Sequence, residues 1–161
     1  MEHTRRVACG ALSACALATV AVGTGTVSAH SGSTERLNLH VSVRILNFPT
    51  ASAPGADIGF DKFPAPFGRG LQYDVFKFIP KTSTTGQAIL KFKAYFDTGT
   101  VSGVWHATYR FTSPTAGIFK QKVDWTGGTG AFRGVRATGM GTGTETGMHG
   151  KITQTVTVTG L

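Results

Sequence analysis

The stretch GGTGAFRGVRATG, from Gly127 to Gly139, places five glycines and two arginines around one phenylalanine, and MGTGTETG follows it directly. A phosphate-binding glycine loop would lead into a helix whose N-terminal amide groups face the anion. The residues that follow have no helical spacing, and the Gly-Lys-Ser/Thr of a Walker loop is absent. Phe132 and Val135 also argue against a shapeless linker. The stretch therefore predicts a tight corner between strands, with Phe132 packed inward and Arg133 and Arg136 pointing elsewhere.

The rest of the chain alternates apolar and polar residues with the period of a β-strand. The clearest case is LNLHVSVRI, residues 37–45, where every second residue is aliphatic. Turn-forming sequences such as PKTSTTG and TSPTAG separate the further strand-like segments, which cover residues 71–79, 87–96, 103–111, 118–125 and 151–159. Many short strands without helices between them predict an all-β fold, either an antiparallel barrel or a sandwich.

One long segment, residues 47–70, interrupts this pattern and is rich in proline. Proline cannot donate a hydrogen bond to a β-ladder, so it is confined to edge strands, strand ends and bulges. We therefore expect this segment to contain a short edge strand and a loop that folds over one end of a barrel. Closure into a barrel would also remove the exposed edges that make a sheet prone to aggregation.

The first 29 residues have the features of a secretory signal peptide. MEHTRR is positively charged, an uncharged apolar run follows, and VSA at 27–29 suits cleavage. TRR at 4–6 is a weak twin-arginine signal, and LSAC at 12–15 fits a lipoprotein box, although the apolar run continues past that cysteine. We expect a secreted bacterial protein with a signal peptide at 1–29, a single domain at 30–161 and no membrane span in the mature chain.

The mature segment carries 14 Lys and Arg against 7 Asp and Glu, a net charge of +7, because the leader holds two arginines and one glutamate of the chain's 16 and 8. The basic residues are scattered rather than clustered in runs, so we expect no nucleic-acid partner. Attraction to anionic partners and an ordinary solvated surface both stay open as interpretations. Both cysteines, Cys9 and Cys15, lie in the leader, and the histidines lack metal-ligand spacing, so we expect no metal and no cofactor.

At the level of motifs, the chain resembles the dirigent and allene oxide cyclase superfamily. GGTGAFRGVRATG is similar to the Gly-Gly-Thr/Ser-Gly-x-Phe corner that precedes a late strand there. GRGLQYDVF, from Gly68 to Phe76, resembles the dirigent Gly-Arg-Ala-Gln-Gly-hydrophobic-Tyr strand, and FDKFPAP just before it resembles the Asp-Asp-Pro-Leu loop. The ordered set spans about residues 37–160. The first strand departs from the family, because His40 is similar to the histidine of its His-Asp pair but no aspartate follows.

The resemblance implies an eight-stranded antiparallel β-barrel with a largely apolar cavity. Members of the superfamily bind small hydrophobic molecules and steer reactive intermediates. Plant dirigent proteins guide phenoxy radical coupling, allene oxide cyclases close a fatty-acid epoxide, and similar bacterial spirotetronate cyclases promote a cycloaddition. The resemblance also implies a homo-oligomer, either a dimer or a trimer.

Two residues are candidates for catalysis through this resemblance. Asp61 matches the acidic residue of the dirigent loop at the cavity mouth, and burial beside Phe60 and Phe63 would raise its pKa and suit it to proton transfer near neutral pH. Arg136 matches an arginine after the glycine corner, where it would orient a phenolate, carboxylate or oxyanion. The alternatives are a loop cap for Asp61 and a strand-surface charge for Arg136.

The candidates for ligand binding share an aromatic ring or a cation, and they are Tyr73, Tyr95, Trp105, Tyr109, Phe132 and Arg133. Each could stack on a ligand or orient it, and ordinary packing is the alternative for each. Asp74 and His106, which the pattern places on polar faces of two strands, would set each other's protonation if they met.

Two functions remain open. In the first, a secreted barrel binds a small hydrophobic ligand and steers its cyclisation, isomerisation or stereoselective coupling without a cofactor, with or without turnover. In the second, the protein is a non-catalytic carrier, or an envelope-associated barrel with a basic surface. An open cavity containing Asp61 and Arg136 would favour the first function, and a lumen plugged by Phe and Trp would favour the second.

Overall fold

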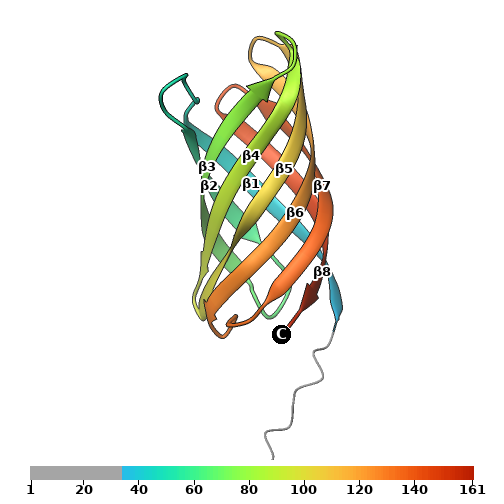
Figure 1. Cartoon of the computed structure of the whole chain (residues 1–161). Helices are drawn as coiled ribbons and strands as arrows, with labels where there is room; N and C mark the ends of the chain where they lie inside the picture. Colours follow the sequence, from blue (N-terminus) through green and yellow to red (C-terminus); the bar gives the residue numbers. More distant parts are fainter. Residues whose placement is uncertain (1–33) are drawn as a thin grey trace, which may run out of the picture.

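A computed structural model describes residues 34–161, which form eight β-strands joined by short connections (Figure 1). The strands are β1 (Glu35–Asn47), β2 (Gly55–Lys62), β3 (Arg69–Pro80), β4 (Thr85–Phe96), β5 (Gly99–Ser113), β6 (Ala116–Gly130), β7 (Arg136–Thr146) and β8 (His149–Thr159). Each strand pairs antiparallel with the next, and β8 pairs with β1 to close the sheet into a barrel. The prediction of an all-β, eight-stranded antiparallel barrel is confirmed.

The expected signal peptide at 1–29 lies outside the described residues. Within residues 34–161 no helix is long and apolar enough to cross a membrane. The expected edge strand within residues 47–70 is wrong in one respect: β2 does lie there, but it pairs with β1 on one side and with β3 on the other. The prolines are accommodated because they lie in the connections before and after β2 rather than within it.

Strand alternation places one face of each strand in the barrel interior. On β1 the aliphatic side chains at 37, 39, 41, 43 and 45 are buried, as the sequence pattern predicts. The wall formed by β2 and β3 reverses this arrangement. Its buried inner side carries Asp57, Asp61, Gln72 and Asp74. Its outer side, continued by one residue of β4, carries what we call the outer apolar face, namely Ile58, Phe60, Leu71, Tyr73 and Tyr95.

The two ends of the barrel differ. One end, which we call the plug end, is filled by five buried aromatic side chains, the aromatic plug of Phe63, Phe67, Phe96, Trp125 and Phe132. Phe67 lies in the β2–β3 connection and contacts the other four, stacking on Phe132 with ring centroids 4.6 Å apart. Residue 161 lies at this end (Figure 1). The connections 47–54, 81–84, 114–115 and 147–148 surround the opposite end, which we call the mouth end.

The glycine-rich stretch forms the predicted corner between β6 and β7. Gly130 and Gly134 have positive φ angles of 61° and 86°, which glycine adopts without the steric cost that a Cβ brings. The turn between them directs Phe132 into the aromatic plug, while Arg133 and Arg136 are exposed. Beyond the corner, the Thr-Gly repeat is itself a strand, β7, with its threonines exposed at 138, 142 and 144. The inward positions of this strand are Ala137, Gly139, Gly141, Gly143 and Glu145.

Candidate functional site

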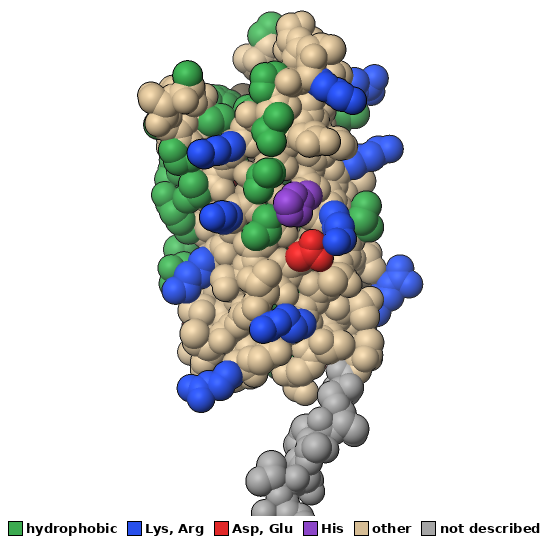
Figure 2. Space-filling view, in the orientation of Figure 1, with side chains coloured by type: hydrophobic (Ala, Val, Ile, Leu, Met, Phe, Trp, Pro, Cys, Tyr) green, Lys and Arg blue, Asp and Glu red, His purple; other side chains and the backbone are tan. Residues whose placement is uncertain are grey.

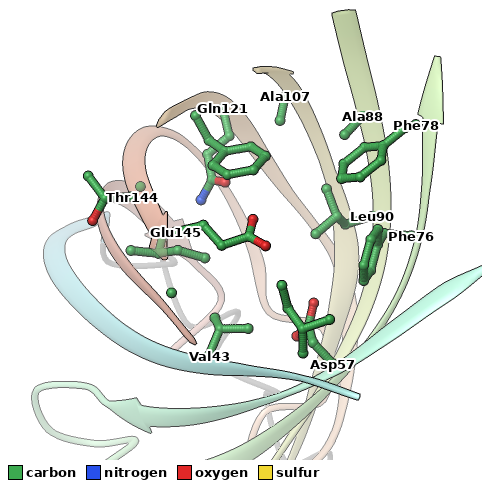
Figure 3. A pocket seen from close by; sticks show the side chains of 15 residues that line it. Val43, Asp57, Phe76, Phe78, Ala88, Leu90, Ala107, Gln121, Thr144 and Glu145 are labelled. Atoms are coloured by element: carbon green, nitrogen blue, oxygen red, sulfur yellow. The ribbon is translucent and has the colours of Figure 1, made fainter. Parts of the chain in front are cut away.

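A cavity lies inside the barrel between its middle and the mouth end, and we call it the lumen cavity (Figure 3). It is narrow, since the centre of a water-sized sphere can move through about 60 Å³ of it. Most of its walls are apolar or glycine. The lining residues are Val43, Ile45, Asp57, Phe76, Phe78, Ala88, Leu90, Ala107, Phe119, Gln121, Gly143, Thr144, Glu145, Gly150 and Ile152.

A second, wider hollow of about 510 Å³ by the same measure lies among the connections of the mouth end. Phe48, Phe111 and Thr115 are among the residues that line it. Glu145 lines both this mouth hollow and the lumen cavity. The side chain of Glu145 therefore stands where a molecule would pass from solvent into the lumen.

The backbone of β7 explains why the lumen is hollow on this side. Gly143 places no side chain in the space beside Glu145, and the cross-strand partners of Glu145 are Gly117 on β6 and Gly150 on β8. Glutamate is thus surrounded by residues without side chains. Its carboxyl group extends toward the middle of the lumen, opposite Phe76 and Leu90 (Figure 3).

A pair of aspartates lies on the opposite wall. Asp57 on β2 and Asp74 on β3 are direct cross-strand partners, and both are buried. The amide Nε2 of Gln72 donates to both carboxylate oxygens of Asp74, at 2.9 and 2.8 Å. Burial raises the pKa of Asp57 to about 6, and a hydrogen bond with Asp74 opposes part of that rise. Burial, and then the charge of Asp57, raise the pKa of Asp74 well above its usual range.

Two further carboxyl groups inside the barrel hold protons near neutral pH. Burial, and then the charge of Asp57, raise the pKa of Glu145 to about 7. Burial raises the pKa of Asp61 to about 7. A carboxyl group with a pKa near the ambient pH is present in both forms, so it can donate a proton in one step and accept one in another. The lumen therefore carries general acid–base capacity.

Polar atoms that lack partners face this space. Asp57 is 4% exposed and Gln121 is 3% exposed, and both line the lumen cavity. Within residues 34–161, nothing hydrogen-bonds to Oδ1 of Asp57 or to Nε2 of Gln121. Leaving a buried polar group unpaired costs about 1–3 kcal/mol, so such groups point to a ligand or to ordered water. The cavity thus presents an acceptor and a donor to whatever enters it.

The structure separates the two predicted catalytic residues, and neither the lumen cavity nor the mouth hollow contains Asp61 or Arg136, so this criterion for a ligand-steering barrel is not met. Asp61 is buried on β2, between the lumen cavity and the aromatic plug, and neither of its oxygens has a hydrogen-bond partner within residues 34–161. It does not line the lumen cavity and lies away from the mouth end. Arg136 is exposed at the start of β7, where its Nη1 donates to the carbonyl oxygen of Val135 at 3.0 Å. Arg133 is exposed in the neighbouring corner.

The six predicted ligand-binding residues also divide between the inside and the outside of the barrel. Tyr73 and Tyr95 are 47% and 45% exposed and belong to the outer apolar face. Trp105 is buried beside Phe92, with ring centroids 5.5 Å apart, and Phe132 belongs to the aromatic plug. Tyr109 is buried near the mouth end against Phe78. None of these residues lines the lumen cavity, although Tyr109 packs against a ring that does.

The residues that do line the site were missed or placed differently from sequence. The sequence pattern places Asp74 and His106 on polar faces of two strands, but Asp74 faces the interior while His106 is exposed, so they do not meet. Asp57 lies in the segment expected to be a loop with an edge strand. Glu145 lies in the Thr-Gly repeat. The alternation of threonine with glycine there was the available signal, because it indicates a strand whose inward positions lack side chains. Within residues 34–161, no cluster of three or more His, Cys, Asp and Glu could hold a metal ion.

Comparison with known proteins places the fold. No protein-family model and no curated protein matches the chain. The pterocarpan synthase dirigent protein GePTS1 is similar in structure, with a TM-score of 0.50 and 14% sequence identity over 81% of this chain and 86% of that one. Another pterocarpan synthase dirigent protein, PsPTS1, aligns with a TM-score of 0.48, 14% identity and coverage of 81% and 96%. A pyocyanin demethylase aligns with a TM-score of 0.36, 16% identity and coverage of 76% and 99%.

The match to GePTS1 supports the fold alone. The chain is a closed eight-stranded antiparallel barrel with the architecture of a dirigent protein.

Proposed function

We propose that this chain is a secreted, dirigent-like barrel that binds a small hydrophobic molecule and steers its cyclisation, isomerisation or stereoselective coupling without a cofactor. The observation that carries the proposal is the lumen cavity, which has mostly apolar walls and two carboxyl groups, Asp57 and Glu145, with pKa values of about 6 and 7. The fold shared with GePTS1 and the signal-like leader support it further.

The geometry suits this chemistry in two ways. A narrow apolar lumen restricts a guest to few orientations, so the faces at which a new bond can form are limited before reaction begins. The carboxyl groups stand on opposite walls, on β2 and β7, so one can donate a proton to a developing oxyanion while the other accepts one elsewhere on the guest. Nε2 of Gln121 offers an additional hydrogen bond.

Chiral product analysis tests the proposal. A prochiral phenol is converted to its radical by an external one-electron oxidant, and a strained unsaturated epoxide serves as the ring-closure probe. We expect product enantiomeric ratios that depart from 1:1 with the wild-type protein and return to 1:1 with Gly150→Leu, which fills the cavity. If the protein binds the probes but every product is racemic, the barrel is a carrier and does not steer the reaction.

The outer surface supports a second candidate, a non-catalytic envelope-associated barrel. Each of the 14 Lys and Arg residues in 34–161 is exposed, whereas Asp57, Asp61, Asp74 and Glu145, four of the seven acidic residues there, face the interior. Figure 2 shows Lys and Arg side chains spread over one face with little acidic surface. Such a surface attracts anionic polymers. Retention on an anionic wall polymer with no effect on any probe reaction would favour this candidate.

We also propose a homo-oligomer, a dimer or a trimer, whose subunits meet through the outer apolar face. Phe60, Leu71 and Tyr95 are adjacent cross-strand partners on β2, β3 and β4 and form one exposed row. Apolar side chains cover the left side of the barrel in Figure 2. Aromatic residues, tyrosine among them, are enriched where protein subunits meet. A second copy of the chain would cover the rings of this face.

A further inference from the structure

Acidic side chains lie mostly inside the barrel, and basic side chains lie outside it. Of the seven acidic residues in 34–161, only Glu35, Asp97 and Asp124 lie on the outside, together with all 14 Lys and Arg. The interior of the described barrel therefore holds four carboxyl groups and no Lys or Arg. Buried charges are normally paired with an opposite charge, because an unpaired charge in a low-dielectric interior is costly.

The surroundings of the cavity carboxyls supply no positive partner within the described chain. Asp57 faces Asp74 on β3 and Ile45 on β1, and Asp61 lies four residues further along β2. Glu145 has Gly117 and Gly150 as neighbours on β6 and β8. The basic residues on the strands that carry or flank Asp57 and Glu145 are all exposed, and they are Arg36, His40, Arg44, Lys62, Arg69, Lys77, Lys120, Lys122, Arg136, His149 and Lys151.

Asp57 is also the buried group that points most clearly to a guest. It is 4% exposed and lines the lumen cavity, and nothing in residues 34–161 bonds to its Oδ1. Glu145 extends toward the same space from the opposite wall (Figure 3). The two carboxyl groups thus line the same cavity from different walls (Figure 3).

We propose that the lumen cavity takes a slim apolar molecule carrying one basic nitrogen, whose ammonium group pairs with the carboxylates of Asp57 and Glu145. This proposal rests on the proposed function, since it names the class of ligand for the same cavity. The ammonium group replaces the missing interior cation, and the apolar part of the molecule packs against Phe76, Leu90 and Ile152. The aromatic rings of Phe76 and Phe119 line the same cavity and would add attraction for a cation held over a ring face.

The proton balance follows from the state of the carboxyl groups. Below the pKa of Glu145, about 7, its carboxyl group is largely protonated in the empty cavity. An ammonium ion that enters from solvent pairs with the carboxylate, and the carboxyl proton is released to solvent. A free amine instead takes the carboxyl proton onto its nitrogen, and the same ion pair forms with no net release. Binding of the ammonium ion must therefore weaken as the pH falls through about 7 and then about 6, where Glu145 and Asp57 take up protons.

Three probes of equal chain length separate this ligand class from its alternatives. Hexylamine, hexanol and hexanoate share a slim apolar body and differ in the head group, and isothermal titration calorimetry measures their binding at pH 8 and pH 5. At pH 8 we expect hexylamine to bind at least about tenfold more tightly than hexanol, and hexanoate to bind least, because carboxylates repel it. At pH 5 the advantage of hexylamine over hexanol should largely disappear.

Variants connect this preference to the two carboxyl groups. Asp57→Asn and Glu145→Gln keep the shape of each side chain and remove its charge, so each should reduce hexylamine affinity about tenfold at pH 8 and change hexanol affinity far less. Asp124→Asn, at a carboxyl group outside the lumen that pairs with Lys122 at 3.2 Å, is the matched control and should change neither. The inference is overturned if hexanol binds as tightly as hexylamine, or if both variants still prefer hexylamine over hexanol. The proposed function stands after either result. Failure of all three probes to bind overturns the proposed function itself.

Discussion

Asp57 and Asp74 face each other as cross-strand partners inside the barrel, on a wall whose outer side is apolar. Two carboxylates placed directly opposite repel each other, so one of them holds a proton near neutral pH. Gln72 donates to both oxygens of Asp74, which orients that carboxyl group and leaves Oδ1 of Asp57 free toward the lumen. The pair therefore behaves as one titrating unit rather than as two independent acids.

The interior acids make the folded protein more stable in mild acid than in mild base. Their pKa values are raised on folding, so the native state binds more protons than the unfolded state between about pH 4, the usual pKa range of aspartate, and pH 7. The free energy of unfolding then falls as the pH rises through this window. Urea unfolding followed by tryptophan fluorescence at pH 5 and pH 8 should give the larger value at pH 5.

Asp61→Asn isolates one of these groups. Asp61 is 3% exposed with a pKa of about 7, so ionising it in the folded state costs up to about 4 kcal/mol at pH 8. The variant should gain about 2–4 kcal/mol at pH 8 and almost nothing at pH 4. Asp124→Asn should show no such gain. A loss of stability that appears only as the pH rises would mean that Asp61 stabilises the fold in its charged form.

Gly150→Leu should close the lumen without unfolding the barrel. A Cβ at this position meets its nearest neighbours, the carbonyl oxygen of Thr144 and the Cβ of Val43, at 3.4 and 3.6 Å, which is ordinary van der Waals contact. The leucine side chain would then occupy the cavity, and hexanol affinity should fall more than tenfold by calorimetry. Thr153→Leu, on the outward side of the same strand, is the control and should bind hexanol like the wild type. Equal affinities for both variants would place the binding site elsewhere.

Phe67→Ala should destabilise the barrel strongly, although Phe67 lies in a connection rather than a strand. Its ring contacts the other four members of the aromatic plug, and removing a buried phenylalanine costs about 3–5 kcal/mol. Phe48→Ala, at an exposed ring in the β1–β2 connection, should cost less than about 1 kcal/mol. Similar urea midpoints for the two variants would show that the plug contributes little to stability.

A charge on the outer apolar face should dissociate the proposed oligomer. Phe60→Lys places a cation at one end of the row formed with Leu71 and Tyr95, where burial in an interface would be unfavourable. Light scattering coupled to size-exclusion chromatography should report a dimer or trimer for the wild type and a monomer for the variant. Met140→Lys, at an exposed residue of β7, should leave the mass unchanged. A monomeric wild-type protein would exclude this interface.

The sequence predicted the barrel where alternation and burial agree. On β1 the aliphatic residues face the interior and the polar ones face solvent, so periodicity alone identifies strand and face. The corner at 127–139 was also predictable, because positive φ angles at Gly130 and Gly134 demand glycine while Phe132 demands burial. These features depend on local geometry and on the hydrophobic effect, which a single sequence displays directly.

The candidate site was not predictable from the same signals, because its walls violate them. On β2 and β3, Asp57 and Asp74 face the interior while Phe60 and Tyr73 face outward, which is the reverse of what apolar alternation indicates. Glu145 is inward because its strand alternates glycine with threonine, a pattern that carries no apolar face. Function accounts for both departures in our proposal: a ligand requires polar groups inside the lumen, and a partner subunit requires apolar groups outside it.

The most direct measurement is an NMR experiment that locates hexanol on the protein. Intermolecular nuclear Overhauser effects are recorded between hexanol and methyl-labelled protein, in the wild type and in Gly150→Leu. We predict contacts from hexanol to the methyl groups of Val43, Leu90 and Ile152, which line the lumen cavity, and their loss in the variant. Contacts confined to outward methyl groups such as those of Ile79 and Ile118, or no contacts at saturating hexanol, would contradict a ligand site inside the barrel.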